Sequence, residues 1–268
     1  MIKLVATDMD GTLLNDKKEM PETTFETIRQ LHQRGIVFAV ASGRQHNSLT
    51  KLYDEIKEDI LIIAGNGSII FDKGDIIFTS PMDKGLVEEI VAFVNHSPKL
   101  KITLCGLHAD YMFKDNVTTV IEPYLVESHF PKRAIIKDLS ELPVDEQIIQ
   151  LAIFDEDYDS KTNIYEPLKH LSDKCHLAVS ANQWLDVMNK GVNKGSAIKK
   201  IQNMLKISPE ETMVFGDHLN DLEMMKEAKY SYAMDNAIAE IKAVSNFVAP
   251  SNEDAGVIKV LTDYLSKN

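Results

Sequence analysis

The chain has 268 residues, of which 29 are basic and 41 acidic, so its net charge is 29 − 41 = −12, and 44% of its residues are hydrophobic. This length fits one large domain or two modest ones, and the composition is that of an ordinary globular protein rather than a disordered chain. The acidic balance excludes a basic nucleic-acid binder, because phosphate backbones require clustered lysine and arginine. A phosphate-bearing ligand could therefore be held only by local means, such as a metal ion, backbone amides or one lysine.

The chain shows no pattern of export or membrane insertion. Its N-terminal apolar run is short and ends in carboxylates, unlike a signal peptide, and no stretch approaches the ~20 apolar residues that span a bilayer. Cys105 and Cys175 match no metal-binding spacing and are expected to be reduced core thiols. We expect a cytoplasmic protein with no membrane or nucleic-acid partner. Because no heptad seam or long exposed apolar strand is visible, we also expect a monomer.

Short apolar runs alternate with helical patterns over the first 67 residues. The runs Ile2–Thr7, Ile36–Ala41 and Ile60–Ala64 lack polar alternation, which is typical of parallel strands covered on both faces. Helices are expected between these runs, over residues 21–34 and 45–56. This rhythm predicts a doubly wound α/β sheet.

The rhythm changes after a predicted β-hairpin, whose strands are Ile69–Phe71 and Ile76–Thr79. From residue 82 to residue 186 the strand patterns are longer and more alternating, and a helix is expected over Leu86–Val94. This segment is predicted to form a separate α+β domain. Its predicted strands are Lys101–Cys105, Tyr111–Lys114 and Ile148–Phe154.

The first rhythm returns after Gly191. A helix is expected over Lys194–Leu205, a strand over Met213–Phe215, short strands near residues 230–234 and 247–250, and a final helix from about residue 255. We therefore predict an α/β fold in which a doubly wound parallel sheet, formed by residues 1–81 and 187–268, is interrupted by an inserted α+β domain, residues 82–186.

Polar side chains follow four of the predicted strands. They are the pair Asp8 and Asp10, Ser42, Asn66, and the pair Asp217 and Asp221. Ligands of open α/β sheets bind beyond the carboxyl ends of the strands, so these side chains are expected to share one crevice. A single Asp there could be a helix N-cap, but two pairs at separate strand ends indicate more. Four converging carboxylates would repel one another without a cation, and all-oxygen ligation favours Mg2+.

These residue types suit phosphoryl transfer. Asp8 can attack a phosphoryl group and form an aspartyl-phosphate, and Asp10 can protonate the leaving oxygen and later deprotonate water. Gly11 allows the turn to approach a ligand closely. Ser42 can hydrogen-bond a phosphoryl oxygen, and Lys194, at an expected helix start, can hold a phosphate. Taken alone, Lys194 would be interpreted as an exposed surface lysine.

The motifs together resemble those of a known family. Asp8-Met9-Asp10-Gly11-Thr12, Ser42-Gly43-Arg44, Lys194 and Gly216-Asp217-His218-Leu219-Asn220-Asp221 resemble, in order and spacing, the four motifs of the haloacid dehalogenase superfamily. The insertion between the second and third motifs resembles the large α/β cap of the Cof-type phosphatases. Within that subfamily the chain is most similar to bacterial sugar phosphatases.

The resemblance implies a role for each motif residue. Asp8 would be the nucleophile and Asp10 the general acid and base. Mg2+ would be held by Asp8, the backbone carbonyl of Asp10 and Asp217, with support from Asp221. The residues expected at the phosphate are Thr12, Ser42, Gly43, Arg44, Asn66, Lys194 and Asn220. The expected function is Mg2+-dependent hydrolysis of a small phosphorylated metabolite, such as a sugar phosphate.

We also interpret three residues near the motifs or the inserted segment. Asp235 stands where the family usually has Gly, and aspartate is expected to tolerate a left-handed backbone there. His218 is interpreted as a loop residue, because an oxygen-lined metal site does not need it. Trp184, the single tryptophan, is interpreted as core or hinge packing.

Two other functions remain open from the sequence. A sugar phosphomutase would keep Asp8 and Asp10 but return the phosphoryl group to the sugar, although mutase relatives usually carry a smaller helical cap. A non-enzymatic, phospho-accepting receiver domain also places acidic residues and a lysine at doubly wound strand ends. Such a domain would be uninterrupted and would lack Asp10 as an acid and base.

Overall fold

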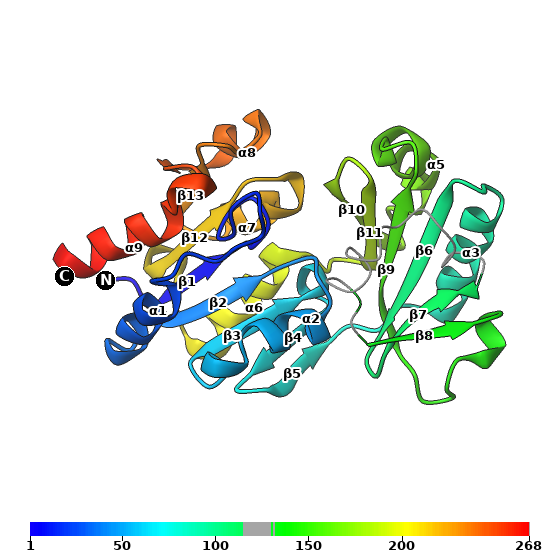
Figure 1. Cartoon of the computed structure of the whole chain (residues 1–268), viewed down its shortest axis with the longest axis horizontal. Helices are drawn as coiled ribbons and strands as arrows, with labels where there is room; N and C mark the ends of the chain where they lie inside the picture. Colours follow the sequence, from blue (N-terminus) through cyan, green and yellow to red (C-terminus); the bar gives the residue numbers. More distant parts are fainter. Residues whose placement is uncertain (115–129, 131, 268) are drawn as a thin grey trace.

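The computed structural model describes residues 1–114, 130 and 132–267, and its strands divide between two sheets (Figure 1). The first sheet has eight strands in the order β14-β13-β12-β1-β2-β3-β4-β5. They are β1 (Leu4–Thr7), β2 (Val37–Ala41), β3 (Ile60–Ala64), β4 (Ile69–Asp72), β5 (Asp75–Thr79), β12 (Thr212–Gly216), β13 (Tyr230–Met234) and β14 (Phe247–Ala249). The pairs from β14 to β3 are parallel, and β4 pairs antiparallel with β3 and β5. This is the predicted doubly wound sheet with its hairpin.

Helices on both sides of this sheet cover its apolar strands. They are α1 (Thr24–Gln33), α2 (His46–Leu52), α6 (Lys194–Leu205), α7 (Leu222–Lys226), α8 (Ala239–Val244) and α9 (Gly256–Lys267), with short 3-10 turns at Asp54–Ile56, Gly65–Gly67 and Leu219–Asp221. All four residues of β1 are buried, as expected for a central strand with both faces covered. The amide of Ile2 donates a 3.0 Å hydrogen bond to the Tyr264 hydroxyl, so the two ends of the chain lie together beside α9 (Figure 1).

The second sheet has six strands in the order β10-β11-β9-β6-β7-β8. They are β6 (Leu100–Gly106), β7 (Asp110–Phe113), β8 (Arg133–Ile136), β9 (Ile148–Asp155), β10 (Cys175–Ala181) and β11 (Trp184–Asn189). The helix α3 (Lys84–Asn95), capped by the Asp83 side chain at the Leu86 amide, packs on this sheet, and a π turn (Lys161–Tyr165) precedes the short α5 (Glu166–Leu168). The three strands predicted for this segment are confirmed within one residue at most ends, and β8, β10 and β11 were not predicted.

Two connections join the sheets, from β5 to α3 and from β11 to α6. They lie against each other, because the Asn189 side-chain amide donates to the Ser80 hydroxyl at 3.2 Å and to the Pro81 carbonyl at 3.0 Å. The predicted boundary after residue 81 falls in the first connection, and the one after residue 186 falls inside β11. The division into domains stays a prediction.

Candidate active site

Parallel register brings the predicted site residues to one edge of the first sheet. In the register of β1 with its neighbours, Thr7 lies opposite Val40 on β2 and Phe215 on β12. The residues that follow these strands therefore emerge side by side at the carboxyl edge, where open α/β sheets bind ligands. Asp8, Ser42 and Asp217 meet at this edge and line one cavity.

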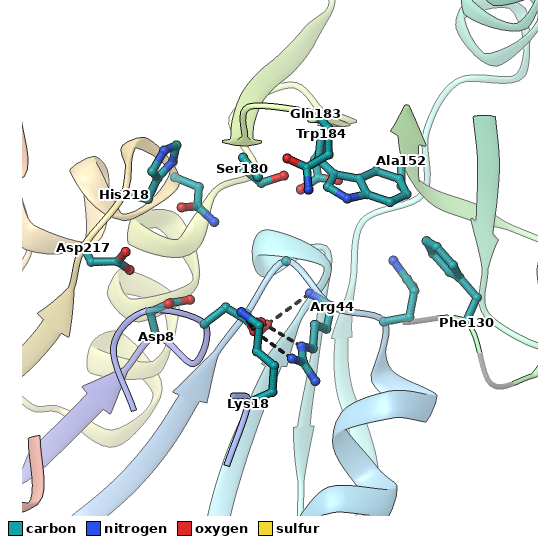
Figure 2. Close-up of a pocket in the computed structure, with 17 residues that line it drawn as sticks. Asp8, Lys18, Arg44, Phe130, Ala152, Ser180, Gln183, Trp184, Asp217 and His218 are labelled. Atoms are coloured by element: carbon teal, nitrogen blue, oxygen red, sulfur yellow. Dashed lines mark hydrogen bonds and ion pairs between the residues drawn. The ribbon is translucent and has the colours of Figure 1, made fainter. Parts of the chain in front are cut away.

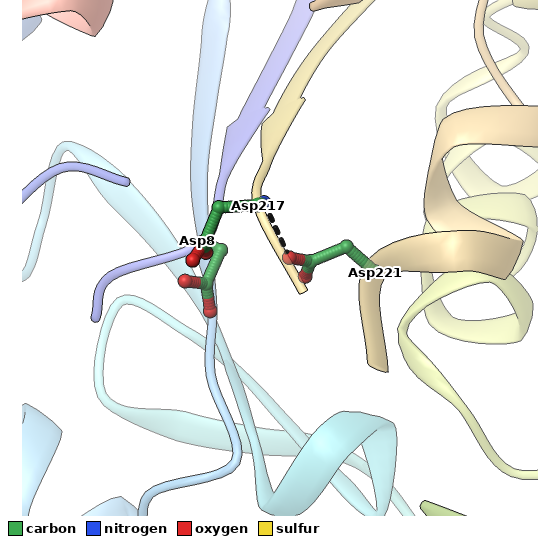
Figure 3. Close-up of side chains that lie close together, drawn as sticks. All are labelled: Asp8, Asp217 and Asp221. Carbon is green, nitrogen blue, oxygen red and sulfur yellow. Dashed lines mark hydrogen bonds between the residues drawn. The ribbon is translucent and has the colours of Figure 1, made fainter. Parts of the chain in front are cut away.

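Three of the predicted carboxylates form a cluster. Asp8, Asp217 and Asp221 each offer a carboxylate oxygen, and these oxygens lie within 4.8 Å of one another (Figure 3). Two backbone amides hold the Asp221 carboxylate in place. Its Oδ2 accepts hydrogen bonds from the amide of Asp217 at 2.9 Å and from that of His218 at 3.1 Å. Such a set of hard oxygen donors can hold a divalent metal ion.

Burial and repulsion between charges disfavour the ionised forms of Asp8 and Asp217. Burial raises the pKa of Asp8 to about 7, against the lowering effect of the Lys194 ammonium and with a further increase from the Asp221 charge. Burial also raises the pKa of Asp217 to about 8, helped by the charges of Asp8 and Asp221. A bound cation would reverse both shifts, because an opposite charge favours the ionised carboxylate.

Lys194 is the one cation inside the cluster among the described residues. The Asn193 side chain caps α6 at the Ser196 amide, and Lys194 follows as the first residue of the helix. Its fully buried ammonium donates to Asp8 Oδ1 at 2.5 Å and to Asp221 Oδ1 at 2.7 Å. Although burial alone lowers the pKa of Lys194, the charges of Asp221 and Asp8 hold it above its usual value. The interpretation as an exposed lysine is therefore wrong.

The Asp10 carboxylate lines the same cavity but does not join the cluster. Its two oxygens accept hydrogen bonds of 2.7 Å from Nε and Nη2 of Arg44, and Lys18 adds an ion pair at 2.9 Å (Figure 2). Burial alone would raise the pKa of Asp10, but the hydrogen bonds and charge of Arg44 hold it well below its usual range. Three of the four predicted carboxylates thus lie close enough together to share one cation, and Asp10 faces the same cavity.

The loop after Asp8 packs directly against the Asp217 segment. Gly11 has φ +83°, and a Cβ atom there would collide with the Asp217 carboxylate. Thr12 donates from its hydroxyl to Asp217 Oδ1 at 2.9 Å, so in this structure its side chain orients a carboxylate of the cluster. Asn236 donates to the Gly11 carbonyl at 2.7 Å. The neighbouring Asp235 is exposed and has a negative φ, so it does not use the left-handed backbone that aspartate was expected to tolerate.

The other residues expected at the phosphate lie where the two sheets meet. The Ser42 hydroxyl accepts from the Arg44 amide at 3.1 Å, and both residues line the cavity together with Gly43. Asn66 is buried in a left-handed conformation, φ 52° and ψ 29°, which asparagine tolerates better than most residues. Its side-chain oxygen accepts from Asn220 at 3.1 Å, and its amide donates at 2.8 Å to Asp186 on β11. Asn66 thus lies between the fourth motif and the second sheet.

The cavity has a volume of about 220 Å³ and its far wall comes from the second sheet (Figure 2). The residues of that wall are Phe130, Ala152, Ser180, Ala181, Gln183, Trp184 and Asp186. Trp184 packs edge-on against Phe154, with ring centroids 5.0 Å apart, and also faces the cavity, so packing is only part of its role. Asp186, Gln183 and Ser180 are not among the predicted site residues, because β10 and β11 were not predicted. His218 lies in the loop as interpreted, and it too lines the cavity.

Comparison with known proteins identifies this arrangement. The sequence model of the haloacid dehalogenase-like hydrolases matches residues 5–261. The chain belongs to the haloacid dehalogenase-like hydrolases. It is 30% identical to 5-amino-6-(5-phospho-D-ribitylamino)uracil phosphatase YbjI of Escherichia coli, over 98% of this chain and 96% of that protein. It is also 30% identical to the HMP-PP phosphatase of Cronobacter sakazakii, over 91% of this chain and 88% of that protein.

A solved structure has the same fold over the whole chain. The crystal structure of SMU.1108c from Streptococcus mutans, 29% identical, matches with a TM-score of 0.90 over 99% of this chain and 100% of that one. This haloacid dehalogenase-like hydrolase is a phosphatase, as predicted, and the alternative of a non-enzymatic receiver does not hold. Among the residues that the structure describes, no helix combines the length and the apolar character needed to cross a bilayer.

Proposed function

We propose that this phosphatase hydrolyses phosphomonoesters of small metabolites, with Asp8 as nucleophile, Asp10 as general acid and base, and Mg2+ as cofactor. The position of Asp8 carries the proposal. Its carboxylate faces the cavity, lies against the Lys194 ammonium and shares a cluster with Asp217 and Asp221. A phosphate that reaches Asp8 therefore meets a cation and the oxygen ligands of a cation at the same point, which offsets the repulsion between two anions.

The charge of the cluster fits a divalent ion. Three ionised carboxylates and one ammonium sum to −3 + 1 = −2, which Mg2+ would balance. Asp8 and Asp217 would hold the ion, with Asp221 in support and the carbonyl of Asp10 as a further ligand that stays a prediction. Bound there, Mg2+ would supply Lewis-acid stabilisation of the charge on the phosphoryl oxygens.

The chain's own groups account for the bond changes. Asp8 Oδ attacks phosphorus as the bond from phosphorus to the leaving oxygen breaks, and Asp10 gives its proton to that oxygen. Asp10 then takes a proton from water, whose oxygen attacks the aspartyl-phosphate, and the bond from Asp8 to phosphorus breaks to release phosphate. We propose that three side chains orient the phosphoryl oxygens, namely Ser42, Lys194 and Asn220. The surroundings of these oxygens are shaped by Gly43, Arg44, Asn66 and Thr12.

We further propose that residues 82–186 form a cap domain that selects the substrate, while residues 1–81 and 187–268 perform the reaction. The supporting observation is that both sheets contribute walls to the cavity that Asp8 lines. The resemblance to bacterial sugar phosphatases favours a sugar phosphate as substrate. The Escherichia coli relative is named for a substrate whose phosphate is on a ribityl group attached to uracil, so a phosphorylated polyol fits both observations.

The decisive test replaces the nucleophile. Wild-type protein with Mg2+ should release free phosphate, rather than an isomerised sugar phosphate, from a panel of sugar phosphates and from p-nitrophenyl phosphate. Asp8→Asn should lower turnover by more than about 1,000-fold, because the covalent step is lost. Asp75→Asn, an exposed aspartate on β5, is the matched control and should retain full turnover. Substantial turnover by Asp8→Asn would contradict the assignment.

A further inference from the structure

We propose that Asp186 determines the specificity of a leaving-group subsite on the second sheet. This subsite accepts a ring-bearing leaving group that is uncharged or cationic and donates a hydrogen bond, and it rejects a leaving group with an additional anionic group. The inference rests on the proposed phosphatase reaction, because it concerns the part of the substrate that the reaction releases.

Charge is distributed unevenly around the cavity. Among the described residues of the second-sheet wall, Asp186 is the single charged side chain, and the others are apolar or neutral. The cations that line the cavity, Lys18 and Arg44, are on the opposite side and both pair with Asp10. A leaving group that projects toward the second sheet would therefore meet a carboxylate and no cation from the described lining.

Residues expected at the phosphate fix the position of the Asp186 side chain. Only 5% of the residue is exposed, and its Oδ2 accepts the 2.8 Å hydrogen bond from Asn66, which in turn accepts from Asn220. Burial raises the pKa of Asp186 to about 6, against the effect of polar neighbours such as Ser180. Hydrogen bonds from the side chains of Ser180, Gln150 and Asn66 stabilise the ionised form of this carboxyl. A carboxylate has about four acceptor sites, so the side-chain hydrogen bonds from Ser180, Gln150 and Asn66 leave capacity for one donor on a ligand.

Two aromatic rings complete the subsite. Trp184 and Phe130 lie with their ring centroids 6.2 Å apart at an angle of 55°, and the edge-on contact with Phe154 holds the Trp184 ring in place. Figure 2 shows Trp184 and Gln183 across the cavity from Asp8 and Arg44. Flat apolar faces with few polar groups beside them suit a ring whose edge donates hydrogen bonds. The cavity volume of about 220 Å³ limits that ring to a small one.

The test uses three aryl phosphates that differ in the charge of one substituent. They are 4-(aminomethyl)phenyl, 4-(carbamoylmethyl)phenyl and 4-(carboxymethyl)phenyl phosphate, of which the second and third have nearly the same shape, and in each a methylene group insulates the leaving oxygen from the end that varies in charge. Wild-type protein with Mg2+ should show a kcat/KM for the first two at least about tenfold above that for the third, because two carboxylates would repel each other in a partly desolvated site.

Variants test whether Asp186 causes this difference in kcat/KM. Asp186→Asn keeps an oxygen that can accept from Asn66 and should reduce the kcat/KM ratio of the aminomethyl to the carboxymethyl compound to below about threefold. Asp157→Asn, an exposed aspartate after β9, should keep the wild-type ratio. Trp184→Leu should raise KM for all three aryl phosphates and keep their ranking.

The outcomes separate this inference from the function on which it rests. If wild-type protein hydrolyses the three compounds with equal kcat/KM, or prefers the carboxymethyl compound, the subsite is overturned and the phosphatase proposal stands. The same holds if Asp186→Asn discriminates as strongly as wild type. If wild-type protein hydrolyses none of the three compounds and no sugar phosphate, the proposed function itself is overturned.

Discussion

Arg44 holds the Asp10 carboxylate by two hydrogen bonds of 2.7 Å, one to each oxygen. A planar guanidinium matches a carboxylate in this way, and the pair keeps Asp10 ionised. A general acid must carry a proton, so Asp10 has to exchange Arg44 for the leaving oxygen of the substrate before it can act. This ion pair therefore keeps the proposed general acid in its deprotonated form.

Arg44→Met should raise the pKa of Asp10. Burial disfavours the carboxylate, and Arg44 is the strongest of the groups that oppose this effect. The pKa, followed by NMR of the carboxyl carbon in the metal-free protein, should move up from its depressed value by more than about one unit. Lys18→Met, which removes a single, more exposed ion pair, is the control and should raise it less. An equal or larger shift in Lys18→Met would contradict this assignment.

Lys194→Met should destabilise the metal-free protein by about 3–5 kcal/mol, because three neighbouring carboxylates then lose their buried cation. Saturating Mg2+ should recover part of this loss, since an ion that binds only the folded state adds to its stability. The free energy of unfolding in urea, with and without Mg2+, measures both effects. Lys199→Met on the exposed face of the same helix should change it by less than about 0.5 kcal/mol. A loss that Mg2+ does not reduce would argue against a cation site beside Lys194.

Mg2+ should bind more tightly as the pH rises from 6 to 9. In the absence of an ion the pKa of Asp8 is raised to about 7 and that of Asp217 to about 8, so both groups carry a proton over part of this range. Binding must expel these protons, and fewer remain to be expelled at higher pH. Calorimetric titrations in buffers of different ionisation enthalpy count the protons released. Asp217→Asn should release fewer, and an affinity that is constant over this range would contradict the prediction.

Gly11→Ala should impair activity as well as stability. The added methyl group would have to displace the Asp217 carboxylate, and the residue would also be strained at φ +83°. Gly35→Ala is the matched control, because its φ is +71° but no atom lies within 4 Å of the added carbon. Both variants should lose about 1–2 kcal/mol of stability from backbone strain. Only Gly11→Ala should lose Mg2+ affinity and kcat, as measured by calorimetry and phosphate release.

Much of the first sheet could be predicted because its local signals agree with its tertiary environment. Ile60–Ala64 is an uninterrupted apolar run and is buried along its whole length as β3. The second sheet was harder to predict. His176 to Ala181 alternates only weakly, and five of the seven residues of β10 are not fully buried, so its pattern does not separate it from a loop.

The candidate site divides in the same way. Asp8, Asp217 and Asp221 follow strands or begin helices, and a carboxyl edge is a place that topology alone predicts. Lys194 could be placed at a helix start, but its burial depends on two carboxylates 186 and 27 residues away in sequence. No local sequence pattern marks Asp186, because its importance comes from its hydrogen bond with Asn66, which joins the two sheets. Contacts of this kind depend on how separate units meet, and no local pattern encodes that.

Asn189 ties together the two places where the chain passes between the sheets. Both covalent connections of residues 82–188 to the rest of the protein therefore pass through one place, while hydrogen bonds such as that of Asn66 to Asp186 join the two sheets at the cavity. The ends of this segment also lie close enough to be joined directly, so recombination could replace the whole segment, and with it Trp184 and Asp186, without rebuilding the sheet that carries the nucleophile.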